Sequence, residues 1–350
     1  MAYIRNKIKP WLWKAKNYSF NDVDTKIRLH LNESPFSPPD HVIQHVIEVL
    51  KYGNLYMNSK LFTEFRELLA EYVGVDEGNI FPYPGGDAAL RAVFYNLVEA
   101  NDNVLLINPT YGMFNIFSSV RGLNVDKVDL KECGDWWCLD FTDIALKARD
   151  SDLVVIDDPN NPTGSPILKG STKLISELAS SVEGFLLIDE TYFEFSKYTA
   201  VPLIRDYPNV IIARSLSKAF SLAGFRLGYI VSSPEVINVL SKAYTPFDIP
   251  LPSLAAGVAA LRDRGYVKLV VETIENNREF MISGLRKLGI KAYNSLTNFV
   301  LVNDSRDLRG ILLKHDVAIK EVGQGLYRFS VGSEEQCVKL LNILGDSLRG

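Results

Sequence analysis

Four short apolar runs predict the strands of a parallel sheet. They are Val104–Ile107, Leu153–Ile156, Phe185–Ile188 and Val210–Ala213, and each is rich in Val, Ile and Leu without alternation of polar residues. Strands with this pattern are covered on both faces, as in sheets that lie between two layers of helices. The sequence therefore predicts a parallel sheet that is buried on both sides.

Amphipathic segments lie before and between these runs. Residues 87–100 place Leu90, Val93 and Leu97 on one stripe with a 3.6-residue period, and residues 61–73 show the same period. Strands that alternate with helices indicate an α/β fold that is built from right-handed crossovers.

The pattern changes after Pro250 and Pro252. Residues 254–288 are expected to be mostly helical, and strand-like runs follow at 298–302 and 326–331. A long helix that leads into a small α+β unit predicts a second domain. The expected units are an N-terminal arm with part of the small domain (1–35), a large domain (36–253) and a small C-terminal domain (254–350).

Composition narrows the class of protein. The chain has 350 residues, 38 Lys and Arg against 42 Asp and Glu, and 47% hydrophobic residues. Such a chain has enough apolar surface to fold, and its length favours roughly two domains. The mildly acidic balance argues against a nucleic-acid partner, which usually needs a basic face. No stretch reaches the ~18 apolar residues of a membrane span, so small molecules are the expected partners.

The cysteines and the N-terminal region point to the cytoplasm. Three cysteines, Cys133, Cys138 and Cys337, are too few for a disulfide framework in a chain of this length. We expect free thiols in a reducing compartment. Cys133 and Cys138 also lack companion histidines, so no metal site is predicted. Pro10 and several lysines interrupt the apolar run that a signal peptide requires.

Side chains that can carry chemistry follow three of the predicted strands. Asn161 lies in DDPNNPTG after the second run, Asp189 and Tyr192 lie in DETY after the third, and Lys218 ends RSLSK after the fourth. Taken singly, these are ordinary turn residues, helix caps or surface lysines. Ligands of open parallel sheets, however, bind beyond the carboxyl ends of the strands. A shared edge therefore favours one binding site.

One ligand suits all of these groups, namely pyridoxal phosphate. A lysine can form an imine with its aldehyde, a carboxylate can keep its ring nitrogen protonated, and an amide with a phenol can bind its ring oxygen. The Gly85-Gly86 turn would point free backbone amides at the phosphate. Ser215, Ser217 and Arg226 can add charge-assisted hydrogen bonds. The sequence therefore predicts a pyridoxal-phosphate site.

Several longer strings resemble a known family. PTYGMF, NNPTG, IDETY, RSLSKAFSLAGFRLGY and TNFVLV, with LNESPF near the start, resemble the histidinol-phosphate aminotransferases over nearly the whole chain. These are fold-type I pyridoxal-phosphate enzymes. The resemblance implies an aspartate-aminotransferase-like α/β fold with a mostly parallel central sheet. It also implies small-molecule amine and 2-oxo acid substrates and a homodimer with sites at the subunit boundary.

The resemblance assigns roles to individual residues around the cofactor. Lys218 matches the Schiff-base lysine, Asp189 the partner of the ring nitrogen, and Tyr111 the aromatic residue that stacks on the ring. Asn161 and Tyr192 match the pair that binds the ring oxygen, and we expect Lys218, Asp189 and Tyr192 to be the catalytic residues. The matching phosphate-binding residues are Gly86, Asp87, Ser215, Ser217, Arg226 and, reaching the phosphate of the other subunit, Tyr56.

The expected substrate residues include two departures from the family. Arg328 in LYRFSVG matches the arginine that binds the anionic group of the substrate, and Asn32 in LNESPF is also assigned to the substrate. Trp11 stands where a tyrosine is expected, which removes a hydroxyl donor to a substrate phosphate. Lys320 replaces a second phosphate-binding arginine, so the charge is kept but the bidentate fork is lost. These changes bear on the identity of the substrate, not on cofactor chemistry.

The implied reaction belongs to histidine biosynthesis. It transfers the amino group of histidinol phosphate to 2-oxoglutarate and gives imidazole acetol phosphate and glutamate. Two other uses of the same cofactor site stay open, a threonine-phosphate decarboxylase and a broad aminotransferase for aromatic or acidic amino acids. A cofactor-binding regulator without turnover is disfavoured, because the full set of Lys218, Asp189, Asn161, Tyr192 and Arg328 is present.

Overall fold

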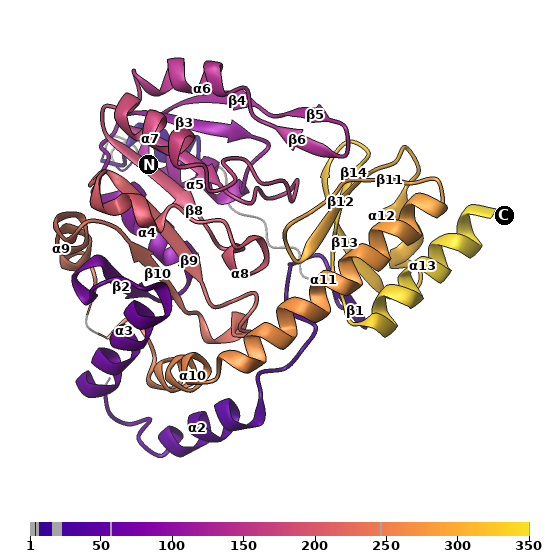
Figure 1. The fold of residues 1–350 in the computed structure, drawn as a ribbon, viewed down its shortest axis with the longest axis horizontal. Coiled ribbons are helices and arrows are strands. Elements are labelled where there is room, and N and C mark those ends of the chain that lie inside the picture. Colours follow the sequence, from indigo (N-terminus) through magenta and orange to yellow (C-terminus); the bar gives the residue numbers. More distant parts are fainter. Residues whose placement is uncertain (1–3, 5–6, 16–22, 57, 246, 350) are drawn as a thin grey trace.

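The computed structural model describes residues 4, 7–15, 23–56, 58–245 and 247–349. These residues form a seven-stranded sheet, a five-stranded sheet and a two-stranded hairpin, with helices around the two larger sheets (Figure 1). The predicted α/β class is therefore confirmed.

The larger sheet contains all four predicted strands as neighbours. Its order is β2 (Ile80–Tyr83), β10 (Gly228–Val231), β9 (Val210–Ser215), β8 (Phe185–Asp189), β7 (Leu153–Asp157), β3 (Asn103–Asn108) and β4 (Asn124–Asp129). Only β10 runs antiparallel to its neighbours β9 and β2. The other pairs are parallel, so the carboxyl ends of β3, β7, β8 and β9 meet at one edge.

Alternate residues of these strands face two separate cores. Val154 and Ile212 belong to one apolar cluster, which includes side chains of α3 (Ser59–Val73), α6 (Phe141–Ala148), α7 (Thr172–Ser181) and α10 (Leu251–Arg262). Val155 and Ile211 belong to the other. That cluster includes side chains of α4 (Gly86–Asn96), α5 (Gly112–Arg121) and α9 (Pro234–Lys242). Burial on both faces explains why the strands lack polar alternation.

The smaller sheet joins the two ends of the chain. Its order is β1 (Ile27–Leu29), β13 (Val317–Gly323), β14 (Leu326–Ser330), β12 (Phe299–Asn303) and β11 (Lys291–Ala292). The predicted runs at 298–302 and 326–331 correspond to β12 and β14. Because β1 pairs in parallel with β13, the N-terminal segment is part of this sheet. The proposed division of the chain near residue 253 stays a prediction.

Helices connect and cover the two sheets. The expected helical stretch 254–288 is two helices, α10 and α11 (Arg264–Lys287), because Asp263 leaves the helical conformation and its carboxylate accepts a hydrogen bond from Gly265 N at 3.1 Å. The remaining segments are α2 (Asp40–Leu50), α8 (Phe193–Ser196), α12 (Leu308–Leu313), α13 (Glu334–Arg349) and the short 3₁₀ turns Pro10–Trp13, Glu77–Asn79, Val201–Arg205 and Ala223–Phe225. None of the helices described here is both long enough and apolar enough to cross a membrane.

The expectation of free thiols is wrong for two of the three cysteines. Cys133 and Cys138 form a disulfide, and Cys337 is a buried free thiol. The two bonded residues lie on β5 (Lys131–Cys133) and β6 (Trp136–Cys138), an antiparallel hairpin that brings their Cα atoms to 6.0 Å. That separation suits a disulfide. The argument from free thiols to a reducing compartment therefore no longer holds.

We predict that removing this disulfide lowers the melting temperature by a few degrees. The bond closes a loop of about six residues, for which the loss of chain entropy in the unfolded state corresponds to about 2 kcal/mol. Calorimetry should compare the wild type in its oxidised and reduced forms with the double variant of C133S and C138S, which should match the reduced wild type. An unchanged melting temperature in the double variant would contradict the prediction.

Candidate active site

Acidic and hydroxyl side chains end three neighbouring strands of the larger sheet. Asp157 ends β7, Asp189 ends β8 and Ser215 ends β9. Asp157 and Asp189 are directly paired in the parallel register, and Asp189 pairs with Ala213. All three residues are buried. The strand ends therefore form the shared edge at which the sequence places a binding site.

Lys218 lies just beyond this edge, with its amine turned toward the segment that follows β1. Its Nζ donates hydrogen bonds to Asn32 O at 3.0 Å and Leu31 O at 3.4 Å. Burial, followed by the positive charge of Arg328, lowers the pKa of Lys218 to about 8. A substantial fraction of the amine is therefore neutral near physiological pH, as a nucleophilic lysine requires.

Asp189 offers one carboxylate oxygen to a ligand. Thr191 donates both its backbone N–H and its hydroxyl to Oδ1, at 3.0 and 2.6 Å. Burial raises the pKa of Asp189 to about 7, and the charges of Asp157 and Asp87 add to this effect. A buried carboxylate of this kind is stabilised in its ionised form when a cation is placed opposite it. A protonated ring nitrogen would supply such a cation.

Hydrogen bonds across the boundary between the two sheets orient the side-chain amide of Asn161 and the phenol of Tyr192. Tyr192 OH accepts from Asn32 Nδ2 at 3.0 Å, and Arg328 Nη1 donates to Asn161 Oδ1 at 2.6 Å. Arg328 Nη2 also donates to His30 O at 2.8 Å. Burial raises the pKa of Tyr192 to about 12, so the phenol keeps its proton at neutral pH. The smaller sheet thus supplies partners for both groups.

A cradle for an anion lies at the start of α4. Gly86 begins this helix, whose first backbone amides have no helical partners. A Cβ on Gly86 would lie 3.4 Å from Ser215 Cβ, so the absence of a side chain keeps the cradle open. Ser215 and Ser217 are buried there and share a hydrogen bond of 2.9 Å. Arg226 Nη2 lies 3.5 Å from Asp87 Oδ2 and adds a positive charge.

Tyr111 lies between the cradle and the strand ends. Its OH donates to Asp87 Oδ1 at 2.9 Å, and its backbone N–H donates to Asp157 Oδ2 at 3.2 Å. The ring meets Phe114 edge-on, with centroids 5.7 Å apart. These contacts fix the ring on the wall of the site, where stacking against a planar ligand is possible.

Lys320 is the cross-strand neighbour of Arg328. The two residues are paired in the β13–β14 register, which places their side chains on the same face of the smaller sheet. Burial and the charges of Arg328 and Arg309 lower the pKa of Lys320. Two adjacent cations suit a substrate anion, as the sequence predicts.

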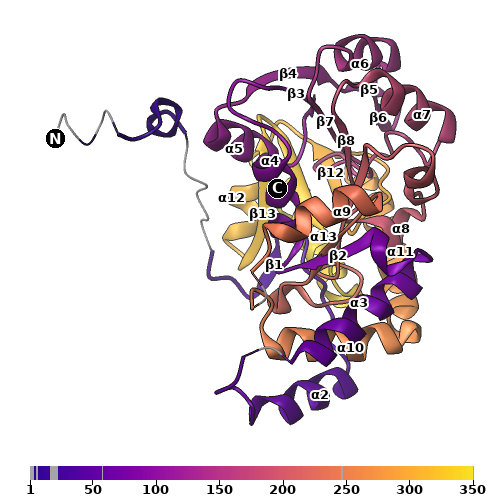
Figure 2. The same ribbon diagram turned by 90° about the vertical axis from the view of Figure 1, so that its left-hand side faces the viewer.

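The structure does not bring Trp11 and Tyr56 to the other predicted residues within one chain. The indole N–H of Trp11 donates to Val120 O at 3.0 Å, and its ring covers Gly122 at the end of α5. Figure 2 shows this N-terminal arm on the side of the molecule where α5 lies. Tyr56 is 78% exposed, and its ring packs against Phe247 with centroids 4.5 Å apart.

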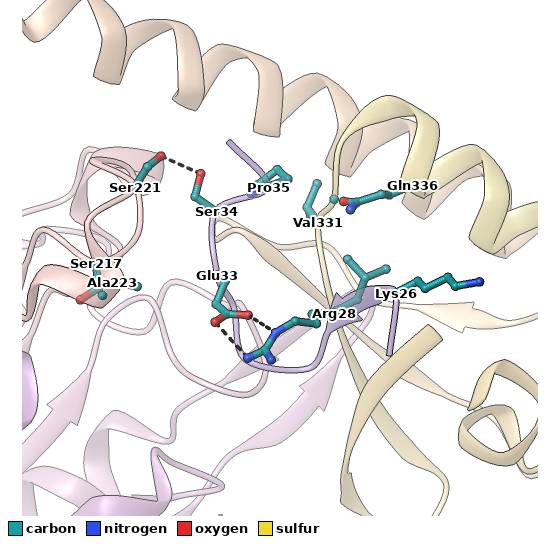
Figure 3. A pocket seen from close by; sticks show the side chains of 13 residues that line it. Lys26, Arg28, Glu33, Ser34, Pro35, Ser217, Ser221, Ala223, Val331 and Gln336 are labelled. Atoms are coloured by element: carbon teal, nitrogen blue, oxygen red, sulfur yellow. Dashed lines mark hydrogen bonds and ion pairs between the residues drawn. The ribbon is translucent and has the colours of Figure 1, made fainter. Parts of the chain in front are cut away.

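A cavity of about 400 Å³ borders the site without forming it. Ser217 belongs to its lining, together with Ser34 and Ser221, whose hydroxyls are 2.7 Å apart, and with the ion pair of Arg28 and Glu33 (Figure 3). Asp189 and Asn161 do not line this cavity. It therefore lies beside the segment that contacts Lys218 rather than over the strand ends.

Sequence reasoning missed two residues that support the site. Asp157 accepts hydrogen bonds from the segments that carry Tyr111 and Asn161, and Thr191 occupies one oxygen of Asp189. Both lie within the motifs that the sequence analysis quoted, directly at strand ends. Their place at or next to a strand end could have identified them. Asp157, however, precedes Asp158-Pro159 and therefore resembles an ordinary turn residue.

The donor set fits pyridoxal phosphate. The cradle at Gly86 has no side chain in the way of a phosphate, and the side chain of Ser215 lies beside it. Asp189 keeps one carboxylate oxygen for a ring nitrogen, and the lowered pKa of Lys218 suits attack on an aldehyde. Lys218, Asp189, Tyr192, Asn161 and Tyr111 would hold the ring. Their individual roles stay predictions.

Comparisons with known proteins agree with this chemistry. The sequence profile "Aminotransferase class I and II" matches residues 24–344. A histidinol-phosphate aminotransferase of Sulfurisphaera tokodaii is 53% identical over 343 residues, which cover 98% of this chain and 96% of that protein. A histidinol-phosphate aminotransferase of Caldanaerobacter subterraneus is 32% identical over 356 residues, which cover 99% of both proteins.

Solved structures with the same fold include two kinds of aminotransferase. The histidinol-phosphate aminotransferase of Sinorhizobium meliloti, solved in complex with pyridoxal-5'-phosphate, has a TM-score of 0.85 and 25% identity over 98% of both chains. A double mutant of Thermus thermophilus aspartate aminotransferase has a TM-score of 0.79 and 23% identity over 92% of this chain and 91% of that one. The chain has the aspartate-aminotransferase-like fold and belongs to the class I and II aminotransferase family.

Proposed function

We propose that this aminotransferase moves the amino group of histidinol phosphate to 2-oxoglutarate. The enzyme is a transaminase that depends on pyridoxal phosphate. The observation that carries the choice of substrate is the 53% identity to a histidinol-phosphate aminotransferase over 98% of the chain. The pair of Lys320 and Arg328 supports it, because two neighbouring cations suit a phosphorylated substrate.

The residues of this chain have separate tasks in that reaction. When bound, pyridoxal phosphate withdraws electrons from the carbon that bears the amino group of the substrate. Asp189 would keep the ring nitrogen in its protonated form, and Asn161 and Tyr192 would orient the ring through its oxygen. Neutral Lys218 Nζ can accept the proton that the substrate carbon loses and return it, which is general acid–base catalysis.

A cytoplasmic homodimer belongs to the same proposal. Three apolar side chains are exposed on one face, namely Leu55, Tyr56 and Phe247, and a second copy of the chain that packed there would cover them. In such a dimer, Tyr56 would reach the phosphate cradle of the other subunit. A substrate that carries a phosphate does not cross a lipid bilayer unaided, because charged groups are costly in hydrocarbon. The cytoplasm, where such metabolites are retained, is therefore the expected compartment.

We predict that histidinol phosphate converts the bound cofactor to its aminated form fastest. Single-turnover runs with histidinol phosphate, glutamate, phenylalanine and threonine phosphate should follow the visible absorbance of the holoenzyme. K218A should abolish turnover with every substrate, because this variant lacks the lysine side chain that transfers the proton. Release of carbon dioxide from threonine phosphate without amino transfer would establish the decarboxylase instead. Equal rates with phenylalanine and histidinol phosphate would establish a broad aminotransferase. Glutamate should convert the cofactor in either case, because it is the product of the second half-reaction.

The lowered pKa of Lys218 predicts the pH dependence of cofactor loading. Only the neutral amine attacks the aldehyde, so the loading rate of the apoenzyme should rise with pH and reach half its maximum near pH 8. R328Q removes a positive charge that lowers this pKa, so its midpoint should lie at higher pH. Stopped-flow absorbance measures both midpoints. A wild-type midpoint near 10.5, the ordinary lysine value, would refute the assignment.

Lys320 should contribute to the recognition of the phosphate group. We expect K320A to raise KM for histidinol phosphate about tenfold with little change in kcat, which corresponds to the loss of about one charge-assisted hydrogen bond. K320R should retain or lower KM, because guanidinium binds phosphate through two donors. Single-turnover reaction of the holoenzyme with unphosphorylated glutamate is the control, because this half-reaction needs no acceptor. Equal losses for both donors would assign Lys320 to stability instead.

A further inference from the structure

We propose that Asp157 is a positioning residue, whose carboxylate fastens the segment carrying Tyr111 to the loop carrying Asn161. These two residues are expected to contact opposite features of the cofactor, its ring face and its ring oxygen. The inference rests on the proposed function only through the cofactor, since it makes no use of the substrate. Asp157 itself contacts the protein groups that present the ligand.

The carboxylate of Asp157 bridges the two segments with both of its oxygens. Oδ1 accepts from Thr110 Oγ1 at 2.8 Å and from Asn160 Nδ2 at 2.9 Å. Oδ2 accepts from Tyr111 N at 3.2 Å and from Asn161 N at 2.8 Å. Each oxygen thus takes one donor from residues 110–111 and one from residues 160–161.

This arrangement requires a carboxylate. Asp157 is only 2% exposed, so the four donors have little access to water as a substitute. An ionised carboxylate accepts at both oxygens, whereas an amide accepts at one and donates at the other. Asparagine at this position would set an NH₂ group against two donors, and buried donors without acceptors are costly. The geometry therefore selects aspartate over its neutral analogue.

The two fastened segments each extend to a further contact in the site. Tyr111 OH donates to Asp87 in the anion cradle, and Asn161 Oδ1 accepts from Arg328 of the smaller sheet. Asp157 therefore lies behind both contacts and sets the distance between them. Loss of its carboxylate would release the ring wall and the amide at the same time.

Asp157 also lies beside Asp189 in the sheet. The two residues are paired in the register of β7 and β8, with Asp87 as the other nearby acid and with Thr191 and Tyr192 as the neighbouring hydroxyl groups. After burial, the charge of Asp157 contributes to the raised pKa of Asp189. Replacing Asp157 with a neutral residue would therefore lower the pKa of Asp189, which a purely structural loss elsewhere would not do.

Asp158 provides a matched control on the same loop. It is 4% exposed, and its carboxylate accepts from Ile167 N at 2.7 Å and Leu168 N at 3.0 Å. D158N makes the same chemical change as D157N in an equally buried neighbour. Its bonds, however, hold the far side of the loop rather than Tyr111 or Asn161.

The test measures how purified wild type, D157N and D158N bind pyridoxal phosphate, without any substrate. We expect D157N to raise the Kd of the cofactor about tenfold or more, in line with the loss of a charge-assisted hydrogen bond. The circular dichroism band of the bound cofactor, which reports ring orientation, should also change. D158N should lower the melting temperature but keep the band and a Kd close to that of the wild type.

A second arm follows the pH dependence of affinity. Pyridoxamine phosphate lacks the aldehyde, so its binding does not depend on reaction with Lys218. The midpoint of its affinity against pH should lie lower in D157N than in the wild type and should be unchanged in D158N. Because the ligand is the same throughout, a difference in midpoint belongs to the protein.

A milder variant keeps the test decisive if D157N does not fold. T110V removes one of the four donors and leaves the carboxylate in place, so we expect a rise in Kd of about two- to threefold, the size of a partial hydrogen-bond loss. The proposal is overturned if D157N, or T110V in its place, binds the cofactor with the Kd and the dichroism of the wild type. It is equally overturned if D158N shows the same losses. Failure of the wild type to use histidinol phosphate would instead refute only the proposed substrate.

Discussion

The site depends on a parallel register that sets two carboxylates side by side inside the protein. Asp157 and Asp189 are paired across β7 and β8, where burial alone makes ionised carboxylates costly. Four donors surround Asp157, and Thr191 donates twice to one oxygen of Asp189. Asp189 keeps the other oxygen for a ligand. The neighbouring loops are therefore ordered by the same charges that prepare the site for a cation.

Residues of the smaller sheet hydrogen-bond to the site residues that follow strands of the larger sheet. Asn32, in the segment after β1, accepts a hydrogen bond from Lys218 and donates one to Tyr192, and its own amide is held by Ser330 of β14. Arg328 of β14 reaches Asn161 across the same boundary. The bonds that reach Lys218, Tyr192 and Asn161 each join the smaller sheet to a segment that follows a strand of the larger sheet, whereas the bond to Ser330 lies within the smaller one. The relative position of the sheets is thus part of the site, and Lys218 owes its lowered pKa in part to Arg328.

The sequence predicts those features that leave a pattern in neighbouring residues, and it misses those that depend on contacts between distant segments. The four central strands were predictable because burial on both faces leaves uninterrupted Val, Ile and Leu, and the residues after them were predictable because strand ends meet at one edge. β1 and β13 were not predictable, since β1 has only three residues and the apolar run of β13 is interrupted by the exposed residues Lys320 and Glu321. The disulfide of Cys133 and Cys138 was missed because it depends on the hairpin of β5 and β6, and the sequence shows no strong strand pattern there. Tyr56 packs on Phe247 at the surface, because its predicted partner belongs to a second copy of the chain.

In the proposed function, cofactor chemistry and substrate choice depend on residues of different sheets. The groups that fit the phosphate and the ring nitrogen, such as Ser215 and Asp189, belong to the larger sheet, whereas Lys320 and Arg328 belong to β13 and β14 of the smaller one. A substitution at Lys320 changes the geometry with which an anion is bound, because an ammonium is a point charge and a guanidinium is a planar fork. It leaves the register of β7, β8 and β9 untouched. A family built in this way can alter its substrate by exchanging residues on the smaller sheet, while the paired acids and the lysine keep one chemistry.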